Sequence, residues 1–250
     1  MLCYEYPFNE RIRTWLRLDA LFARALHFST LQGKHEHHAA LRGLFEIIDM
    51  VATRSDLKSE LLKELERQRQ NVLAYRANPD VSDQALNDTM RLLDSVYDRL
   101  LAVHGKLGRS VRHNDWLMAI KNRSAIPGGV CEFDLPAYHH WLHEAPERRV
   151  ADIQSWLEPL IPLHDTIQGL LKLLRGSASS EDQVARNGLF LLNLSNLNIQ
   201  MARVEIDPER RCNPEISANK YALNIRFIST SDDEPCHHRD IDFRLTLCSL

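Results

Sequence analysis

The chain has 250 residues, of which 44% are hydrophobic and 26% are charged. These values are typical of folded globular proteins and exclude disorder as the overall state. The 31 Lys and Arg residues are balanced by 34 Asp and Glu residues, which gives a net charge of −3. The protein as a whole therefore lacks the positive field that holds nucleic acid, and any basic site must be a local patch.

Charged residues interrupt the beginning of the chain from Glu5 to Arg24. No segment there is apolar enough for a signal peptide, and no segment elsewhere stays apolar over the length of a membrane span. We therefore expect a cytoplasmic protein without membrane insertion. The cysteines are odd in number, widely spaced and never arranged as CxxC, so we expect free thiols. They are Cys3, Cys131, Cys212, Cys236 and Cys248.

Apolar residues recur at three- and four-residue spacing over residues 10–175, which predicts packed amphipathic helices. The first helix would bury Ile12, Trp15, Leu16, Phe22, Ala25 and Leu26, and the second Leu44, Ile47, Ile48 and Val51. A third helix should begin at Ser55-Asp56 and end at Asn78-Pro79-Asp80. A fourth should end at His104-Gly105, and a fifth should contain Trp116, Leu117 and Ile120.

Proline and glycine divide the next part of the chain. The segment Ile126-Pro127-Gly128-Gly129 predicts a sharp turn, because Pro fixes φ and Gly permits positive φ. A short extended piece over 130–133 should follow it. Pro136 and Pro146 can each begin a helix, and a last helix is expected over 162–174. The small polar residues at 176–183 predict a linker.

Beyond the linker the apolar period changes from that of a helix to that of a strand. One alternating set is Tyr221, Leu223, Ile225 and Phe227, and another is Ile241, Phe243, Leu245 and Leu247. Residues 189–206 should add at least one strand, with loops at 207–219 and 229–239. Residues 2–6 can supply another strand, so the two chain ends should meet. The prediction is an α+β fold, with a helical domain over 10–178 and a small antiparallel or mixed β domain over 179–250 that includes a strand at 1–7.

No pattern that specifies a catalytic or phosphate-binding site is present, because GxSxG, HExxH, GxGxxG and GxxxxGK[ST] are all absent. The stretch His104-Gly105-Lys106-Leu107-Gly108-Arg109-Ser110 is basic and contains glycine. It follows a predicted helix, however, whereas a phosphate loop follows a buried strand. A hydrolase that uses His139 or His143 remains an alternative. We expect neither an enzyme nor a cofactor.

Metal and nucleic-acid sites are not expected either. His139 and His143 are four residues apart and could bind zinc together on a helix, but two ligands do not close a metal site. We interpret them as surface or structural histidines, and Asp232-Asp233-Glu234 as a solvated loop. The tryptophans have the spacing of a helical core and do not alternate with basic residues. They are Trp15, Trp116, Trp141 and Trp156.

Several long segments closely resemble the ZapD family of Z-ring-associated proteins. They are Tyr4-Glu5-Tyr6-Pro7-Phe8-Asn9-Glu10-Arg11-Ile12-Arg13-Thr14-Trp15-Leu16-Arg17-Leu18, Glu60-Leu61-Leu62-Lys63-Glu64-Leu65-Glu66-Arg67-Gln68, Ile126-Pro127-Gly128-Gly129-Val130-Cys131-Glu132-Phe133-Asp134-Leu135-Pro136, Trp141-Leu142-His143, Pro214-Glu215-Ile216-Ser217 and Ile225-Arg226-Phe227. The resemblance implies a cytoplasmic homodimer at the mid-cell division site. It also implies binding to the C-terminal tail of FtsZ and bundling of FtsZ filaments. The alternative is a helical scaffold or adaptor for another division protein.

The tail implied by the resemblance carries acidic and apolar residues, and a basic groove with apolar walls suits such a peptide. The residues at basic family positions are Arg54, Arg112, Arg123, His139, Lys220 and Arg226. Even spacing independently places Lys220, Asn224 and Arg226 on one face of a strand. The alternative for Arg226 is a structural pair with Asp242 across the sheet.

Two residues depart from the family pattern. Ala222 stands where relatives carry Arg, and Asp115 stands where they carry another basic residue. The expected consequence is a less positive groove, or one that is shifted toward Arg54, Lys58 and Arg112.

Overall fold

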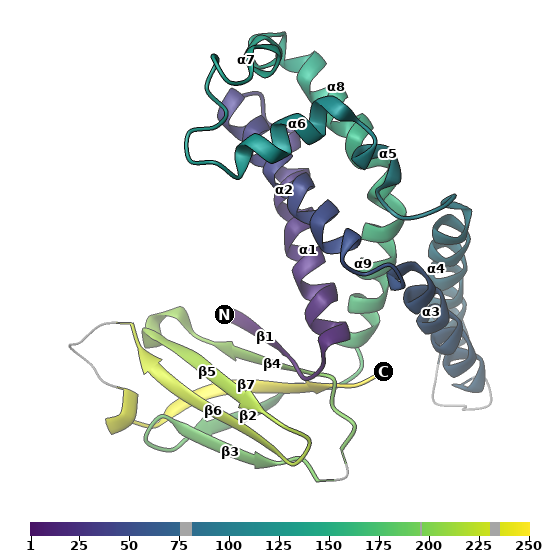
Figure 1. Ribbon diagram of the computed structural model, residues 1–250. Coiled ribbons are helices and arrows are strands. Elements are labelled where there is room, and N and C mark those ends of the chain that lie inside the picture. The colour runs from purple at the N-terminus through teal and green to yellow at the C-terminus, as the bar shows by residue number, and fades with distance from the viewer. Residues whose placement is uncertain (76–81, 196, 231–235) are drawn as a thin grey trace. The chain divides into compact units, whose positions relative to one another are not determined.

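The computed structural model describes residues 1–75, 82–195, 197–230 and 236–250. The chain forms two compact units, one of Arg17–Leu170 and one that combines Met1–Leu16 with Leu171–Leu250 (Figure 1). The described part of the first unit is helical, and the strands that the structure describes belong to the second. The class is therefore α+β, as predicted. Asn78-Pro79-Asp80 and Asp232-Asp233-Glu234 lie outside the described residues.

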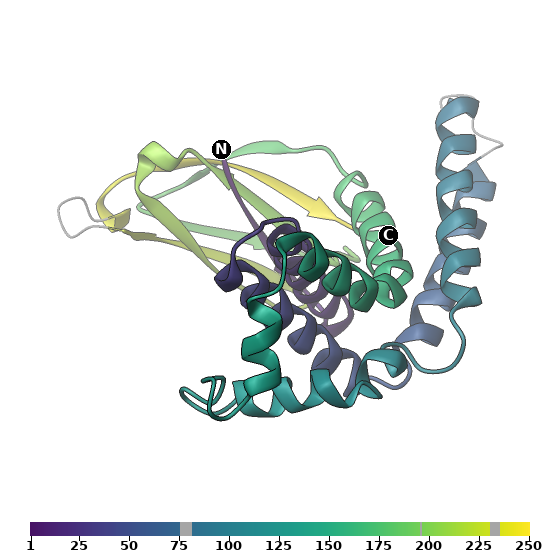
Figure 2. The same cartoon turned by 90° about the horizontal axis from the view of Figure 1, so that it is seen from above.

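The helical unit is built from amphipathic helices. They are α1 (Glu10–Ser29), whose first turns belong to the other unit, α2 (Lys34–Ala52), α3 (Leu57–Ala74), α4 (Asp83–Ala102), α5 (Arg109–Arg112), α6 (Asp115–Ser124), α7 (Pro136–Leu142), α8 (Pro146–Leu157), the 3-10 turn η2 (Glu158–Leu160) and α9 (Ile161–Arg175), which continues into the second unit. Helices α3 and α4 run side by side as a hairpin (Figure 2).

The apolar faces predicted for the first two helices are confirmed. Trp15, Phe22, Leu44 and Ile47 are completely buried, while Leu16 and Leu26 are half-buried at the margin of the face. The two helices approach closely in one place, because a Cβ atom added to Gly43 of α2 would lie 3.0 Å from the Cβ of Ala25 in α1. Hydrophobic burial of these faces is the main force that holds the unit together.

The second unit contains two antiparallel sheets. Their strands are β1 (Leu2–Pro7), β2 (Glu181–Ala185), β3 (Leu189–Asn193), β4 (Met201–Ile206), β5 (Cys212–Ala218), β6 (Ala222–Ser229) and β7 (Ile241–Cys248). One sheet has the order β1-β4-β7-β2, and the other has the order β3-β6-β5. Leu2 pairs with Ile206, so the N-terminal strand joins the C-terminal strands as predicted. The two sheets share a buried core, in which Phe227 and Phe243 contact each other at 5.1 Å between ring centroids.

The structure corrects three local predictions. Strand β5 occupies most of the predicted loop at 207–219, and β2 begins inside the predicted linker at 176–183. The piece at 130–133 forms turns and is not extended; it is held by bonds such as that from the Cys131 amide to the Gly128 carbonyl at 3.3 Å. Gly128 has a φ of 71°, which a glycine adopts readily, so the predicted sharp turn at 126–129 is confirmed.

The expectation that all cysteines are free is wrong for two of them. Cys212 begins β5, and Cys236 begins the 3-10 turn η4 (Cys236–His238), which contacts β6. The two residues form a disulfide, whereas Cys3, Cys131 and Cys248 are free thiols. Two cysteines that are 24 residues apart match no disulfide pattern in the sequence. The packing of η4 against the sheet brings them together.

Candidate functional site

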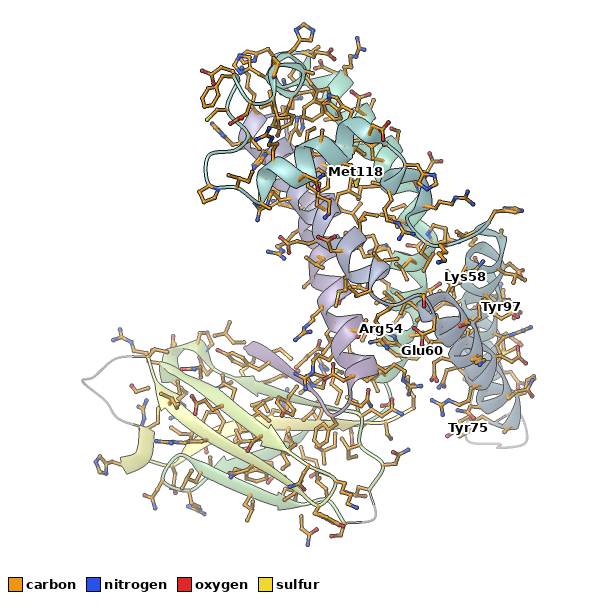
Figure 3. The ribbon with its side chains drawn as sticks, viewed as in Figure 1. Arg54, Lys58, Glu60, Tyr75, Tyr97 and Met118 are labelled. Carbon is orange, nitrogen blue, oxygen red and sulfur yellow. A yellow bond between two sulfur atoms is a disulfide. The ribbon has the colours of Figure 1, made fainter. Side chains whose placement is uncertain are left out.

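A pocket of about 290 Å³ lies where the start of α3 meets the loop that follows α4. It lies within the helical unit. Figure 3 shows Arg54, Lys58 and Glu60 around the start of α3. The pocket is lined by Val51, Ala52, Arg54, Ser55, Lys58, Ser59, Leu62, Gly105, Lys106, Leu107 and Arg112. These lining residues include four cationic side chains, and among the described residues no acidic side chain lines the pocket.

Local backbone structure brings the two basic segments together. Helix α2 ends at Ala52, and a turn closed by the hydrogen bond from the Leu57 amide to the Arg54 carbonyl starts α3. After α4, Gly105 and Gly108 have φ values of 74° and 68°, which reverse the chain into α5. A Cβ atom on Gly108 would lie 2.6 Å from the Cδ1 of Ile48 in α2, so a larger residue would have to displace that side chain and adopt an unfavourable positive φ.

Hydrogen bonds hold three of the pocket cations in place. The Lys58 ammonium donates to the carbonyl of Leu101 at 3.2 Å and to that of Val103 at 2.5 Å. Arg112 donates to the carbonyl of Leu107 at 3.3 Å, and Arg54 forms an ion pair with Glu60 at 3.1 Å. Lys58 therefore also satisfies carbonyl groups at the end of α4, where a positive charge is favourable.

The pocket continues along the outside of the loop. A second hollow is lined by Gly105, Lys106, Arg109, Arg112 and His113, and a third adds Val103, His104, Gly108, Ser110, Pro159 and Pro162. Neighbouring hollows share lining residues, so they adjoin one another. We call them together the basic groove and define it by Arg54, Lys58, Lys106, Arg109 and Arg112. Its apolar walls come from Val51, Leu62, Leu107, Val103, Pro159 and Pro162.

Lys106 and Arg109 are the members of the groove that the sequence did not identify. Both are exposed, and neither forms an ion pair with any residue that the structure describes. The available signal was the basic, glycine-containing stretch at 104–110. It does not match a phosphate loop, yet its two glycines have positive φ and the turn brings Lys106 to the start of α3, while Arg109 lines the adjoining hollows.

The structure groups Arg54 with Arg112 but not with the other predicted site residues. Arg123, in α6, lies 3.5 Å from Asp134, and His139, in α7, is exposed. The His139 ring contacts that of His143, with 4.4 Å between centroids, and the described residues contain no group of three metal-ligating side chains. Neither Arg123 nor His139 lines the groove, and Asp115 does not line it either.

The β unit carries the remaining two predicted residues. Arg226 is exposed on β6, where its cross-strand neighbours are Leu189 and Glu215. The alternative of a pair with Asp242 is wrong, because Asp242 belongs to the other sheet and pairs with Arg210 at 2.7 Å. Arg226 forms no ion pair with a described residue.

Lys220 does not lie on the same strand as Arg226, which corrects the prediction of a single strand face. Strand β6 begins at Ala222, and Lys220 belongs to the preceding turn. Its ammonium lies 4.7 Å from the ring centroid of Tyr221, as in a cation–π contact. Asn224 and Arg226 share the exposed face, and Ile225 and Phe227 are buried on the other, as predicted.

A buried polar pair also shapes the helical unit. Arg149 of α8 and His37 of α2 are both buried. Burial and the nearby Arg149 charge lower the pKa of His37, although a hydrogen bond with the Leu31 carbonyl opposes this shift. This pair lines none of the hollows that form the groove.

Comparison with known proteins agrees with the resemblance. The family model described as "ZapD: Cell division protein" matches residues 16–226. The chain is 50% identical over 254 residues to a protein named Cell division protein ZapD from Dechloromonas aromatica, covering 100% of both chains. It is 48% identical over 252 residues to the protein of that name from Aromatoleum aromaticum, covering 100% of this chain and 98% of the relative. None of the described helices is long and apolar enough to cross a membrane. The chain belongs to the ZapD family of cell division proteins.

Proposed function

We propose that this chain binds the acidic and apolar C-terminal tail of FtsZ and, as a homodimer, bundles FtsZ filaments at the mid-cell division site. It does so in the cytoplasm without catalysis, cofactor, nucleic acid or insertion in a membrane. The observation that carries the proposal is the basic groove, which is present in a chain of a cell division family. The groove joins cations from two distant segments and places apolar side chains beside them.

The groove suits a flexible acidic peptide for physical reasons. Arg54 and Arg112 can donate charge-assisted hydrogen bonds to carboxylates, which are roughly twice as strong as neutral ones. Part of their geometry is fixed before the ligand arrives, because each already has a hydrogen-bond or ion-pair partner. The N-terminal end of α3 also lies at the pocket and favours negative charge.

The other predicted residues act as additional contacts in this proposal. Arg123 and His139 are supplied by α6 and α7, and Lys220 and Arg226 by the β unit. A long flexible tail, or several tails on one filament, can use separate basic surfaces at once. Each such contact is weak when exposed, but contacts that form together add to the overall affinity.

Binding of a synthetic peptide with the sequence of the FtsZ C-terminus tests the groove. Arg112→Glu should weaken binding at least tenfold, because it removes an attractive charge and adds a repulsive one. Lys34→Glu is the matched control, since Lys34 is exposed in the same unit and does not line the groove. Equal affinities for the two variants would remove the groove from the binding site.

A pull-down separates this function from that of a scaffold or adaptor for another division protein. The bait is the full chain, and the prey is either intact FtsZ or FtsZ without its terminal peptide. The proposed function requires that the shortened FtsZ is not retained. Equal retention of both forms would favour the adaptor, which does not need the tail.

A further inference from the structure

The two sheets of the β unit have four edge strands, and three of them carry features that discourage pairing with another chain. Strand β2 contains Glu181 and Asp182, and β5 contains Pro214. Strand β1 contains Pro7 together with Glu5, whose carboxylate pairs with Arg175 and Arg203. Charged residues and prolines on an edge are common means of preventing edge-to-edge association.

Strand β3 differs from the other three edges. Its sequence is Leu189-Phe190-Leu191-Leu192-Asn193, which has no charge and no proline. Among the described strands it pairs with β6, and the Leu189 amide also donates to the Arg186 carbonyl at 2.9 Å. The Phe227 amide donates to the Gly188 carbonyl at 2.8 Å, and the Leu194 amide donates to that of Tyr221 at 2.7 Å. The N–H and C=O groups of successive residues point to opposite sides of a strand. Since those of Gly188 and Leu194 point toward β6, those of Leu191 and Asn193 point toward the open edge.

The outward face of this edge is also apolar. Leu191 is 73% exposed and Leu189 is 55% exposed, and the two side chains are neighbours on the same face of β3. Phe190 and Leu192 on the other face remain half-buried, although they pack against the core between the sheets. An additional strand would cover leucines on one face and complete the burial of Phe190 and Leu192 on the other.

The surroundings of the edge are positively charged. Arg226 lies opposite Leu189 in the register of β6, and it forms no ion pair with a described residue. Lys220 lies in the turn that enters β6. Glu215 lies opposite Arg226 on the side that is away from β3, and Asp240, at the turn before β3, pairs with Arg186. The edge therefore favours a partner that carries carboxylates.

We propose that the open edge of β3 binds an extended segment of a partner protein, which adds as a fourth strand to the β3-β6-β5 sheet. The segment has aliphatic side chains at alternate positions, which pack on Leu189 and Leu191, and carboxylates that face Arg226. This surface belongs to the β unit. It shares Arg226 with the additional contacts proposed for the FtsZ tail, and it goes beyond them because binding is by addition of a strand to the edge of β3. Main-chain hydrogen bonds supply affinity, and the leucines and Arg226 supply selectivity.

The experiment uses the purified full chain to select binders from a displayed library of random linear peptides, and it keeps those that still bind the groove variant Arg112→Glu, because the groove also accepts acidic, apolar peptides. The selected peptides should be rich in aliphatic residues and carboxylates. They should lose at least tenfold in affinity for Leu191→Lys, which places a charge on the edge, and severalfold for Arg226→Glu. Leu2→Lys is the matched control, because Leu2 is an exposed leucine on the β1 edge. It should bind the selected peptides as the wild type does.

Backbone methylation tests strand addition itself. N-methylation of one alternate set of residues in a selected peptide should abolish binding, while methylation of the other set should leave it within about threefold. The proposal is overturned if no aliphatic, acidic family of peptides is selected, if Leu191→Lys binds normally, or if both methylated sets bind equally. If Leu191→Lys converts a dimer to a monomer in sedimentation, a second copy of the chain occupies the edge and the proposed partner is wrong.

Discussion

The Nε atom of Arg149 donates a hydrogen bond to the Nδ1 atom of His37 across 2.9 Å, and both side chains are buried. Since Nδ1 accepts, His37 is neutral and its Nε2–H donates to the Leu31 carbonyl at 2.5 Å. A second proton on the ring would meet the Arg149 guanidinium directly. The pair thus connects α2 with α8 only while His37 stays uncharged.

This relationship predicts a loss of stability in mild acid. Burial lowers the pKa of His37 from 6.5, and it also lowers that of His38, where the Arg42 charge acts in the same direction. A histidine whose folded pKa is below its unfolded pKa contributes full stability above about pH 6.5, and this contribution decreases as pH falls toward the folded pKa. Each unit of lowering is worth about 1.4 kcal/mol.

Urea unfolding at pH 7.5, 6.5 and 5.5 provides the measurement. The wild type should lose stability over this range, and His37→Gln, although less stable at pH 7.5, should have a shallower dependence on pH. His27→Gln is the control, because His27 is exposed on α1 and should leave the wild-type slope unchanged. Parallel slopes for wild type and His37→Gln would contradict the prediction.

Arg149 itself should be essential for the stability of the helical unit. Its guanidinium donates to the carbonyls of Leu142, Glu144 and Gln32 at 2.8, 2.6 and 2.7 Å. Arg149→Met leaves these acceptors without a donor, and we expect a loss of about 3–5 kcal/mol in the free energy of unfolding. Arg149→Lys should recover only part of the loss, because an ammonium cannot reproduce the planar fork.

The control is the adjacent Arg148→Met. Arg148 is exposed and pairs with Glu144 at 2.8 Å, so its replacement should cost no more than about 1 kcal/mol. Urea unfolding of the three variants at neutral pH gives the comparison. If Arg149→Met and Arg148→Met were equally stable, the buried hydrogen bonds would not have the assigned role.

Substitutions of two groove lysines should differ in their effects on protein stability and on binding of the FtsZ peptide. Lys58→Met removes a donor to two carbonyls at the end of α4, so it should lower stability by about 1–2 kcal/mol and also weaken the FtsZ peptide. Lys106→Met should weaken the peptide with little change in stability, because Lys106 is exposed and has no ion-pair partner among the described residues. Thermal melts and peptide titrations of both variants test this difference.

Arg226→Glu should weaken the FtsZ peptide and have a small effect on stability. Asp242 pairs with Arg210, so the substitution leaves that ion pair intact. The new carboxylate would face Glu215 across the strands, which costs about 0.2–1 kcal/mol. Thermal melts beside binding curves provide the test. Unchanged peptide binding would remove Arg226 from the tail site, and a large loss of stability would give it a structural role.

Bundling depends on valence, because one site per chain can coat a filament but cannot join two filaments. A homodimer supplies two copies of each site by symmetry. We therefore expect the protein to sediment as a dimer and to bundle FtsZ filaments without a nucleotide of its own. Bundling should decrease with salt more steeply than binding of one peptide, since several screened contacts act together.

A variant that is monomeric but retains peptide affinity should coat FtsZ filaments without bundling them. Sedimentation establishes its oligomeric state, and light scattering with electron microscopy measures the bundles. Bundling by the monomer at the wild-type level would mean that two sites on one chain are sufficient, and the dimer would not be the cross-linker.

The sequence by itself determined the helical and extended periods and the family. The spacing of Ile12, Trp15 and Phe22 identified a buried helix face, and the alternation of Leu223, Ile225 and Phe227 identified a strand with one buried face. These signals are local, because side chains of a helix or strand return to the same face every few residues. Strand β5 escaped detection because Pro214 and the polar residues beside it weaken the pattern, and an edge position tolerates them.

Only the tertiary structure decided which segments become neighbours. It placed β6 and β7 in separate sheets, which excluded the pairing of Arg226 with Asp242, and it brought Cys212 to Cys236. It also placed Arg54, which precedes the α3-α4 hairpin in the sequence, beside Arg112, which follows it. Lys106 and Arg109, which also follow the hairpin, belong to the same groove. The physical reason is that packing between elements depends on their whole surfaces and on the turns between them, whereas periodicity records only which side of each element is apolar.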